Sequence, residues 1–120
     1  MSRYSNRLPS DYAQAERMLG KRDQRTLFNN TMIHRGGNRR VFVTHHGSVI
    51  GSFEADGSVM LTNAGYGSVS TRERLNSMAP AGVGFVQRNY AQMIMQRAGD
   101  EVTYTPGGTV QIAPDGTVRV

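Results

Sequence analysis

Glycine-containing turn signals recur about every ten residues through the middle of the 120-residue chain. The three turns are Gly36-Gly37-Asn38, His46-Gly47 and Asp56-Gly57. Glycine adopts positive φ without a steric clash, so Asp-Gly in particular is a strong hairpin signal. Runs rich in β-branched and aromatic residues lie between the turns, and the strands expected from them cover residues 30–35, 41–44, 49–53 and 59–62. The pattern predicts a four-stranded antiparallel meander.

Alternation along these strands predicts which side chains share a face, because successive side chains of a strand point to opposite sides. The residues expected on one common face are Val41, Val43, Val49, Phe53, Val59 and Leu61. All six are apolar, so we expect this face to carry the core.

A glycine-rich corner, residues 63–67, follows the fourth expected strand and leads into a helix. Ser70 and Glu73 have the spacing of a capping box, which predicts a helix over 71–79 that Pro80 ends. Helical spacing directs Leu75, Met78 and Ala79 toward the sheet. The residues expected to face solvent are Arg72, Arg74 and Asn76.

Shorter elements precede and follow this central part. Ser10 or Asp11 can cap a helix over 11–19, residues 1–10 are expected to form a flexible arm, and residues 21–25 read as a basic connector. After the second helix the expected strands cover 82–86, 102–105, 109–113 and 117–120, whereas 90–97 fits a helix or a strand.

The predicted fold class is therefore α+β. We expect a small antiparallel β-sheet (meander) with the N-terminal helix and the helix at 71–79 packed on it. Residues 11–120 form a single domain in this interpretation, and 101–120 extend it as C-terminal β-hairpins.

Composition narrows the class of protein. The chain has no cysteine, which excludes disulfides, thiolate metal sites and cysteine nucleophiles. No apolar run approaches membrane-spanning length and the N-terminus lacks the apolar segment of a signal peptide, so we expect a soluble cytoplasmic protein with no membrane contact.

The protein is strongly basic, because the sequence contains 14 Lys and Arg residues and 9 acidic residues. The only lysine is Lys21. Arginine pairs bidentately with phosphates and carboxylates, so a nucleic-acid surface or an acidic protein partner is one interpretation. A GC-rich genome explains the choice of arginine over lysine equally well, although it does not explain the net charge of +5.

Enzymatic chemistry is not indicated. Adjacent His45 and His46 are expected to point to opposite faces of a strand, so they cannot hold one metal together. The glycine-rich corner lacks the lysine and the spacing of a P-loop, which favours a tight strand-to-helix turn. With no nucleophile–base set visible, we expect a non-enzymatic binding protein without cofactor, metal or small-molecule substrate.

Arginines on loops and exposed faces, with aromatic residues near them, are the remaining site candidates. They are Arg35, Arg39, Arg40, Tyr66, Arg72, Arg74 and Arg88. Such a set suits phosphate contact and base stacking, and a solvated polar face explains it as well. Tyr66 lies between two glycines; its ring either projects beside the helix as a binding anchor or folds back onto the sheet edge.

The order of several short motifs resembles the order found in a family of small bacteriophage proteins. They are Asn29-Asn30-Thr31, His46-Gly47, Asp56-Gly57, Leu61-Thr62-Asn63, Gly65-Tyr66, Val69-Ser70-Thr71, Arg74-Leu75-Asn76 and Gln87-Arg88. Tyr66 stands where that family usually has a tryptophan. The resemblance implies a phage origin and a strand rather than a helix over 91–96, and it implies no particular activity.

Three functional hypotheses follow for a phage-type accessory protein. The first is nucleic-acid binding through an arginine-rich face. The alternatives are an inhibitor or modulator that docks on an acidic host protein or defence complex, and a structural component of the virion. The expected location is the cytoplasm of the bacterial host, or the virion for the third hypothesis.

Overall fold

A computed structural model describes residues 7–65, 69–80, 83–88, 91–95, 101–104 and 107–119. The helices are α1 (Tyr12–Leu19) and α2 (Val69–Met78). The strands are β1 (Gln24–Phe28), β2 (Thr31–Gly36), β3 (Arg40–His45), β4 (Ser48–Glu54), β5 (Val59–Thr62), β6 (Gly84–Arg88), β7 (Ala91–Met95), β8 (Glu101–Tyr104), β9 (Thr109–Ile112) and β10 (Val118–Arg119).

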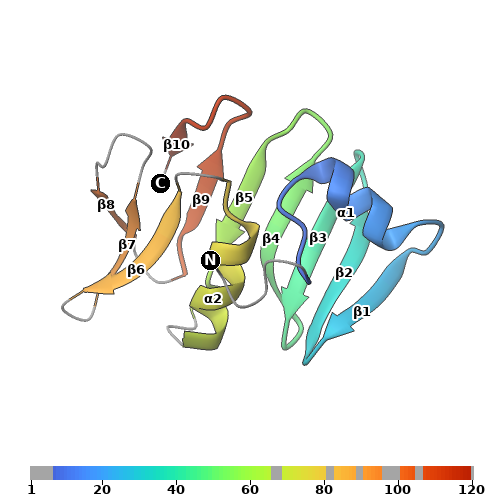
Figure 1. The fold of residues 1–120 in the computed structure, drawn as a ribbon, viewed down its shortest axis with the longest axis horizontal. Coiled ribbons are helices and arrows are strands. Elements are labelled where there is room, and N and C mark those ends of the chain that lie inside the picture. Colours follow the sequence, from blue (N-terminus) through green and yellow to red (C-terminus); the bar gives the residue numbers. More distant parts are fainter. Residues whose placement is uncertain are drawn as a thin grey trace.

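The strands form two antiparallel sheets (Figure 1). One sheet has seven strands in the order β1-β2-β3-β4-β5-β9-β10, and the other has three in the order β6-β7-β8. The α+β class and the meander are confirmed, and 91–95 is a strand. The expectation of one common sheet is wrong. Strand β9 joins the larger sheet by pairing with β5, but β6, β7 and β8 pair only with one another among the described strands.

One strand was missed by the sequence pattern. Residues 24–28, assigned partly to a basic connector, form β1 at the edge of the seven-stranded sheet. Its pattern is obscured because Gln24, Arg25 and Thr26 are all exposed, so no apolar alternation marks it.

A bulge between β3 and β4 corrects the predicted face of Val49. Val43 pairs with Gly51 and the next residue, Thr44, pairs with Val49, so Ile50 is the extra residue on β4. The alternation shifts by one position at that point. Ile50 is buried as a result and Val49 is 39% exposed, whereas the other five predicted face residues are buried.

The core lies between the seven-stranded sheet and both helices, which cover the same face of that sheet (Figure 1). Asp11 caps α1 by accepting a 2.7 Å hydrogen bond from the backbone N–H of Gln14. Ala15 and Leu19 of α1 and Leu75 and Met78 of α2 are buried in one apolar cluster, together with the inward residues of β2 to β5 and β9. The predicted inward direction of Leu75 and Met78 is confirmed.

The start of α2 differs from the capping-box expectation. The helix begins at Val69, so Ser70 lies in its first turn rather than at the cap. Asn76 also differs: its side-chain amide donates to the carbonyl of Phe85 (3.0 Å) and accepts from the Phe85 N–H (2.6 Å). These two hydrogen bonds join α2 to β6. The polar side chain of Asn76 therefore bonds within the protein instead of facing solvent as expected.

Candidate functional site

Two arginines donate hydrogen bonds to backbone carbonyl groups at the C-terminal end of α1. Arg25 Nη1 donates to the carbonyl of Met18 (2.8 Å), and Arg35 Nη2 donates to the carbonyl of Gly20 (2.9 Å). The last carbonyls of a helix lack partners within it and carry partial negative charge, so cations there are stabilising. Both side chains stay exposed, and each guanidinium has five N–H donors, so donors remain for a ligand.

Arg35 is held further by Glu16. Arg35 Nη1 lies 2.6 Å from Glu16 Oε1. This hydrogen bond lowers the pKa of the Glu16 carboxyl and raises the pKa of the Arg35 guanidinium from their ordinary values. The ion pair is solvent-exposed, so it fixes the direction of Arg35 more than it stabilises the fold.

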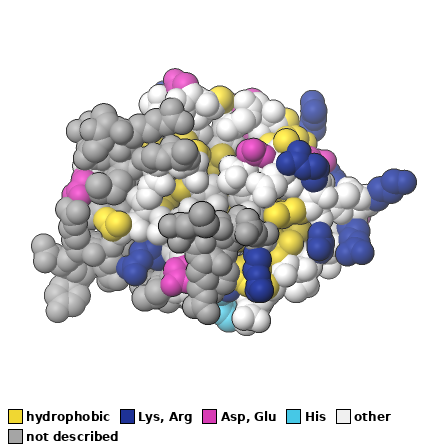
Figure 2. All heavy atoms as spheres, in the orientation of Figure 1, with side chains coloured by type: hydrophobic (Ala, Val, Ile, Leu, Met, Phe, Trp, Pro, Cys, Tyr) yellow, Lys and Arg dark blue, Asp and Glu magenta, His cyan; other side chains and the backbone are white. Residues whose placement is uncertain are grey.

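We define the basic cluster as six exposed residues around α1, β1 and the β2–β3 turn. They are Arg17, Lys21, Arg22, Arg25, Arg35 and Arg39. The first four line one shallow hollow beyond the end of α1, and Arg39 is close enough to Glu16 to help lower the pKa of that carboxyl. Figure 2 shows Lys and Arg side chains gathered over the end of the molecule that carries α1 and β1.

Most of the net charge of the protein comes from this region. Residues 16–39 contain six basic and two acidic residues, whereas the rest of the chain contains eight basic and seven acidic residues. A charge of +4 out of the total of +5 therefore lies in a fifth of the sequence. Opposite charge is scarce there, because Glu16 is already paired with Arg35 and Asp23 is the other carboxylate.

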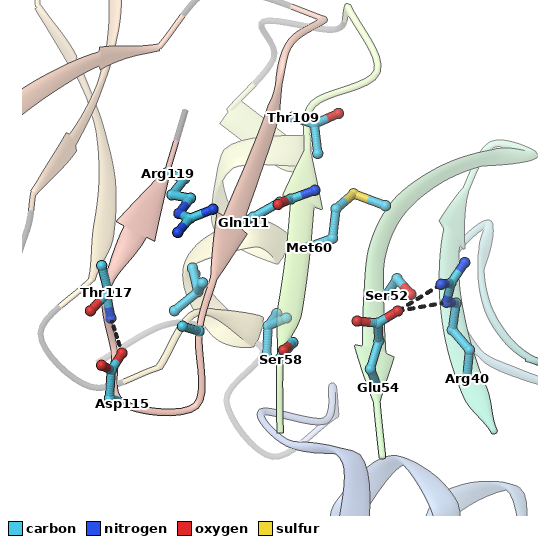
Figure 3. Close-up of a pocket in the computed structure, with 13 residues that line it drawn as sticks. Arg40, Ser52, Glu54, Ser58, Met60, Thr109, Gln111, Asp115, Thr117 and Arg119 are labelled. Atoms are coloured by element: carbon cyan, nitrogen blue, oxygen red, sulfur yellow. Dashed lines mark hydrogen bonds and ion pairs between the residues drawn. The ribbon is translucent and has the colours of Figure 1, made fainter. Parts of the chain in front are cut away.

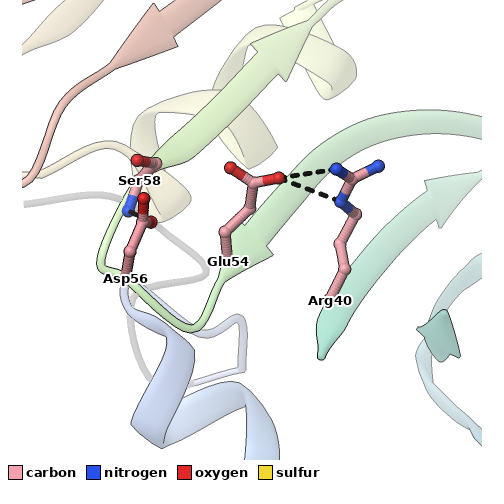
Figure 4. Close-up of polar contacts among 4 residues, drawn as sticks. All are labelled: Arg40, Glu54, Asp56 and Ser58. Carbon is pink, nitrogen blue, oxygen red and sulfur yellow. Dashed lines mark hydrogen bonds and ion pairs between the residues drawn. The ribbon is translucent and has the colours of Figure 1, made fainter. Parts of the chain in front are cut away.

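Arg40 lies apart from this cluster, on the sheet face opposite α1 and α2 (Figure 1). It pairs with Glu54 directly across β3 and β4, through Nε at 3.1 Å and Nη2 at 2.6 Å from Oε1 (Figure 4). Its guanidinium carbon also lies 6.0 Å from the centre of the Phe42 ring. Arg40 therefore belongs to a different surface from Arg35 and Arg39.

Arg74 is buried, and the prediction that it faces solvent is wrong. Only 2% of the residue is exposed. Its guanidinium donates to Thr31 Oγ1 (2.8 Å), to the Asn29 carbonyl (3.2 Å) and to Ser70, and it lies 4.9 Å from the centre of the Phe28 ring. Arg74 thus connects α2 to the β1–β2 turn instead of offering a charge to a partner.

The other predicted site residues do not join the cluster. Arg72 is half-buried on α2, and Arg88 ends β6 with a side chain outside the described set. Tyr66 lies outside the described residues, so its two alternatives stay open. Arg17, Lys21, Arg22 and Arg25 were missed as site residues, although the charge density of 21–25 was the available signal.

The histidine pair is arranged differently from the expectation of opposite faces. His46 has a positive φ of 51°, which ends the strand geometry, and the two ring centres lie 4.3 Å apart. His45 is buried; desolvation, followed by the charges of Arg74 and His46, lowers the pKa of its imidazole. Within the described residues no three His, Asp or Glu side chains are grouped as metal ligands.

Comparison with known proteins places the chain in a family. The sequence profile of the Kyanoviridae Gp96 protein matches residues 12–111. No curated protein and no solved structure matches the chain. In the described part of the chain, no helix is long and apolar enough to cross a membrane. Since the match covers most of the sequence, the chain belongs to the Kyanoviridae Gp96 family of bacteriophage proteins.

Proposed function

We propose that this phage protein binds nucleic acid through the basic cluster. The observation that carries the proposal is the density of cations in residues 16–39, which hold a net charge of +4 and whose six basic side chains are all exposed. A surface of this kind attracts the phosphate backbone, because each neutralised phosphate releases condensed counterions.

The composition of the cluster favours phosphate contact over base reading. All six members are cations, and two of them, Arg25 and Arg35, are held in place by the α1 carbonyls. An arginine positioned in this way binds phosphate oxygens with little further loss of side-chain entropy. Phosphate contacts carry no direct sequence information, so binding is expected to be independent of sequence.

The proposal is tested by fluorescence anisotropy with a labelled DNA duplex and its single strand over a series of salt concentrations. The logarithm of the affinity should fall linearly with the logarithm of salt, with a slope of about −0.9 per phosphate neutralised on duplex DNA. Absence of binding to either DNA and to RNA of the same sequence at about 50 mM salt would remove the proposal.

The variant Arg17→Ala/Lys21→Ala/Arg22→Ala tests the place of binding. These three exposed side chains make no ion pair with the described residues, so the fold should persist. The salt slope should become shallower by about one for each lost phosphate contact. The single variant Arg22→Ala should also make the slope shallower. Its matched control is Arg119→Ala, which removes one exposed arginine outside the cluster and should leave the slope unchanged.

The competing hypotheses give different results. A modulator of an acidic host protein would capture a stoichiometric partner from nuclease-treated lysate, and the cluster variant would lose that partner. A virion component would be found in purified particles by mass spectrometry. Either result without binding to nucleic acid contradicts the proposal.

A further inference from the structure

On the face of the seven-stranded sheet opposite α1 and α2, a row of side chains crosses the strands in register (Figure 1). Phe42 of β3 pairs with Ser52, Ser52 with Met60, Met60 with Gln111 and Gln111 with Arg119 of β10. Residues paired across strands point to the same side of a sheet. These side chains therefore share the surface opposite the core.

The β3, β4, β5, β9 and β10 strands form a hollow on this surface (Figure 3). Its volume is about 640 Å³, which falls within the range of small-molecule binding sites. Along the row its lining runs from Ser52 to Arg119, across three strand spacings or roughly 14 Å. An occupant that follows the row is elongated.

Ser52 supplies a buried polar group without a partner at one end of the row. The residue is 2% exposed, and its hydroxyl forms no hydrogen bond with the described residues. Met60 extends from β5 toward the strand that carries Ser52 (Figure 3). An unpaired buried hydroxyl costs stability, so a ligand that moves the flexible Met60 side chain aside and bonds to the hydroxyl relieves this cost.

The charges of the hollow balance, in contrast to the basic cluster. Arg40 is paired with Glu54, and the remaining charged side chains are Arg119 and Asp115. Two cations and two anions give no net attraction for a phosphate chain. The lining instead offers donors from the arginines, acceptors from Glu54, and both from Gln111 and Ser52.

We propose that this hollow binds an uncharged oligosaccharide. Sugar hydroxyls donate and accept hydrogen bonds at once, which matches a lining that contains both kinds of group without net charge. The chain of rings would follow the row from Ser52 toward Arg119, and the Met60 side chain, moved away from Ser52, would pack against the apolar face of a ring. The proposal concerns a different surface from the basic cluster, so either can hold without the other.

The test is isothermal titration calorimetry with four probes, the uncharged tetrasaccharides of glucose, mannose, galactose and N-acetylglucosamine. At least one should bind saturably, with a dissociation constant of about 1 mM or lower. Ser52→Ala should weaken this binding by on the order of tenfold, because it removes one hydrogen bond. The variant should stay folded, since it deletes a hydroxyl that has no described partner.

Two glutamines form a matched pair of variants. Gln111→Ala alters the hollow, whereas Gln24→Ala alters a residue in register with the same row, on β1 and outside the hollow. Binding should weaken with Gln111→Ala and persist with Gln24→Ala and Arg22→Ala. Failure of all four probes at about 10 mM overturns the proposal. Equal losses with both glutamine variants, or displacement of the sugar by a single-stranded oligonucleotide, would also overturn it.

Discussion

Arg74 Nε donates a 2.8 Å hydrogen bond to Thr31 Oγ1, which joins α2 to β2 across 43 positions of the sequence. Arg74 also bonds to the Asn29 carbonyl, and its guanidinium lies against the Phe28 ring. A buried arginine requires such partners, because an unsatisfied charge in the interior is costly. The position of α2 on the sheet thus depends on a polar contact as well as on Leu75 and Met78.

Arg74→Ala should lower the free energy of unfolding by about 1–3 kcal/mol, because it leaves Thr31 Oγ1 and the Asn29 carbonyl without this donor. Urea denaturation measures the loss. Arg17→Ala, an exposed arginine on α1, is the control and should change stability by less than about 0.5 kcal/mol. Equal stability of both variants would show that the Arg74 contacts are dispensable.

Leu75→Ala should destabilise the protein by about 2–5 kcal/mol, because Leu75 is fully buried and its truncation leaves a cavity between α2 and the sheet. The same denaturation experiment applies. An unchanged unfolding midpoint would mean that α2 presents a different face to the core.

The bulge in β4 predicts opposite outcomes for two neighbouring residues. Ile50→Ala should cost about 2–5 kcal/mol, since Ile50 is fully buried. Val49→Ala should cost less than about 1 kcal/mol, since Val49 is 39% exposed. Uninterrupted alternation would reverse the order of the two losses, so their ranking in urea tests the bulge directly.

Stability should fall as the pH drops below about 6.5, the ordinary pKa of histidine. The pKa of folded His45 is lowered by burial and by Arg74, so the unfolded chain takes up the proton at a higher pH than the folded one. Stability is then complete above the unfolded pKa and is lost as pH falls through the folded pKa. The dependence of stability on pH is measured from urea midpoints at pH values from 7.5 to 5, about one unit above to one and a half below the ordinary histidine pKa.

His45→Gln is the control for the pH dependence, because glutamine does not titrate. The slope in this window should flatten in the variant. The carboxyls of Glu16 and Asp56 also have lowered pKa values, but they add their losses only in more acidic solution, below their ordinary values of 4.5 and 3.8. A slope that persists in His45→Gln would assign the dependence to another group.

Features that depend on neighbours in the sequence were predictable. The Asp56-Gly57 and His46-Gly47 turns fix their hairpins locally, and the Asp11 cap fixes the start of α1, so these elements lie where the pattern places them. Turn and cap chemistry acts over two to four residues, and the information is therefore present in the sequence itself. The net charge is likewise a property of the composition.

Only the tertiary structure decided where those charges lie. Arg74 was expected to face solvent, yet it lies four residues before Met78 on the buried face of α2, where contacts with Asn29 and Thr31 hold its guanidinium. The basic cluster forms because the end of α1, strand β1 and the β2–β3 turn meet in space, and the row from Ser52 to Arg119 exists because β9 pairs with β5. Contacts between residues far apart in the chain depend on which surfaces pack together, and local periodicity carries no record of that choice.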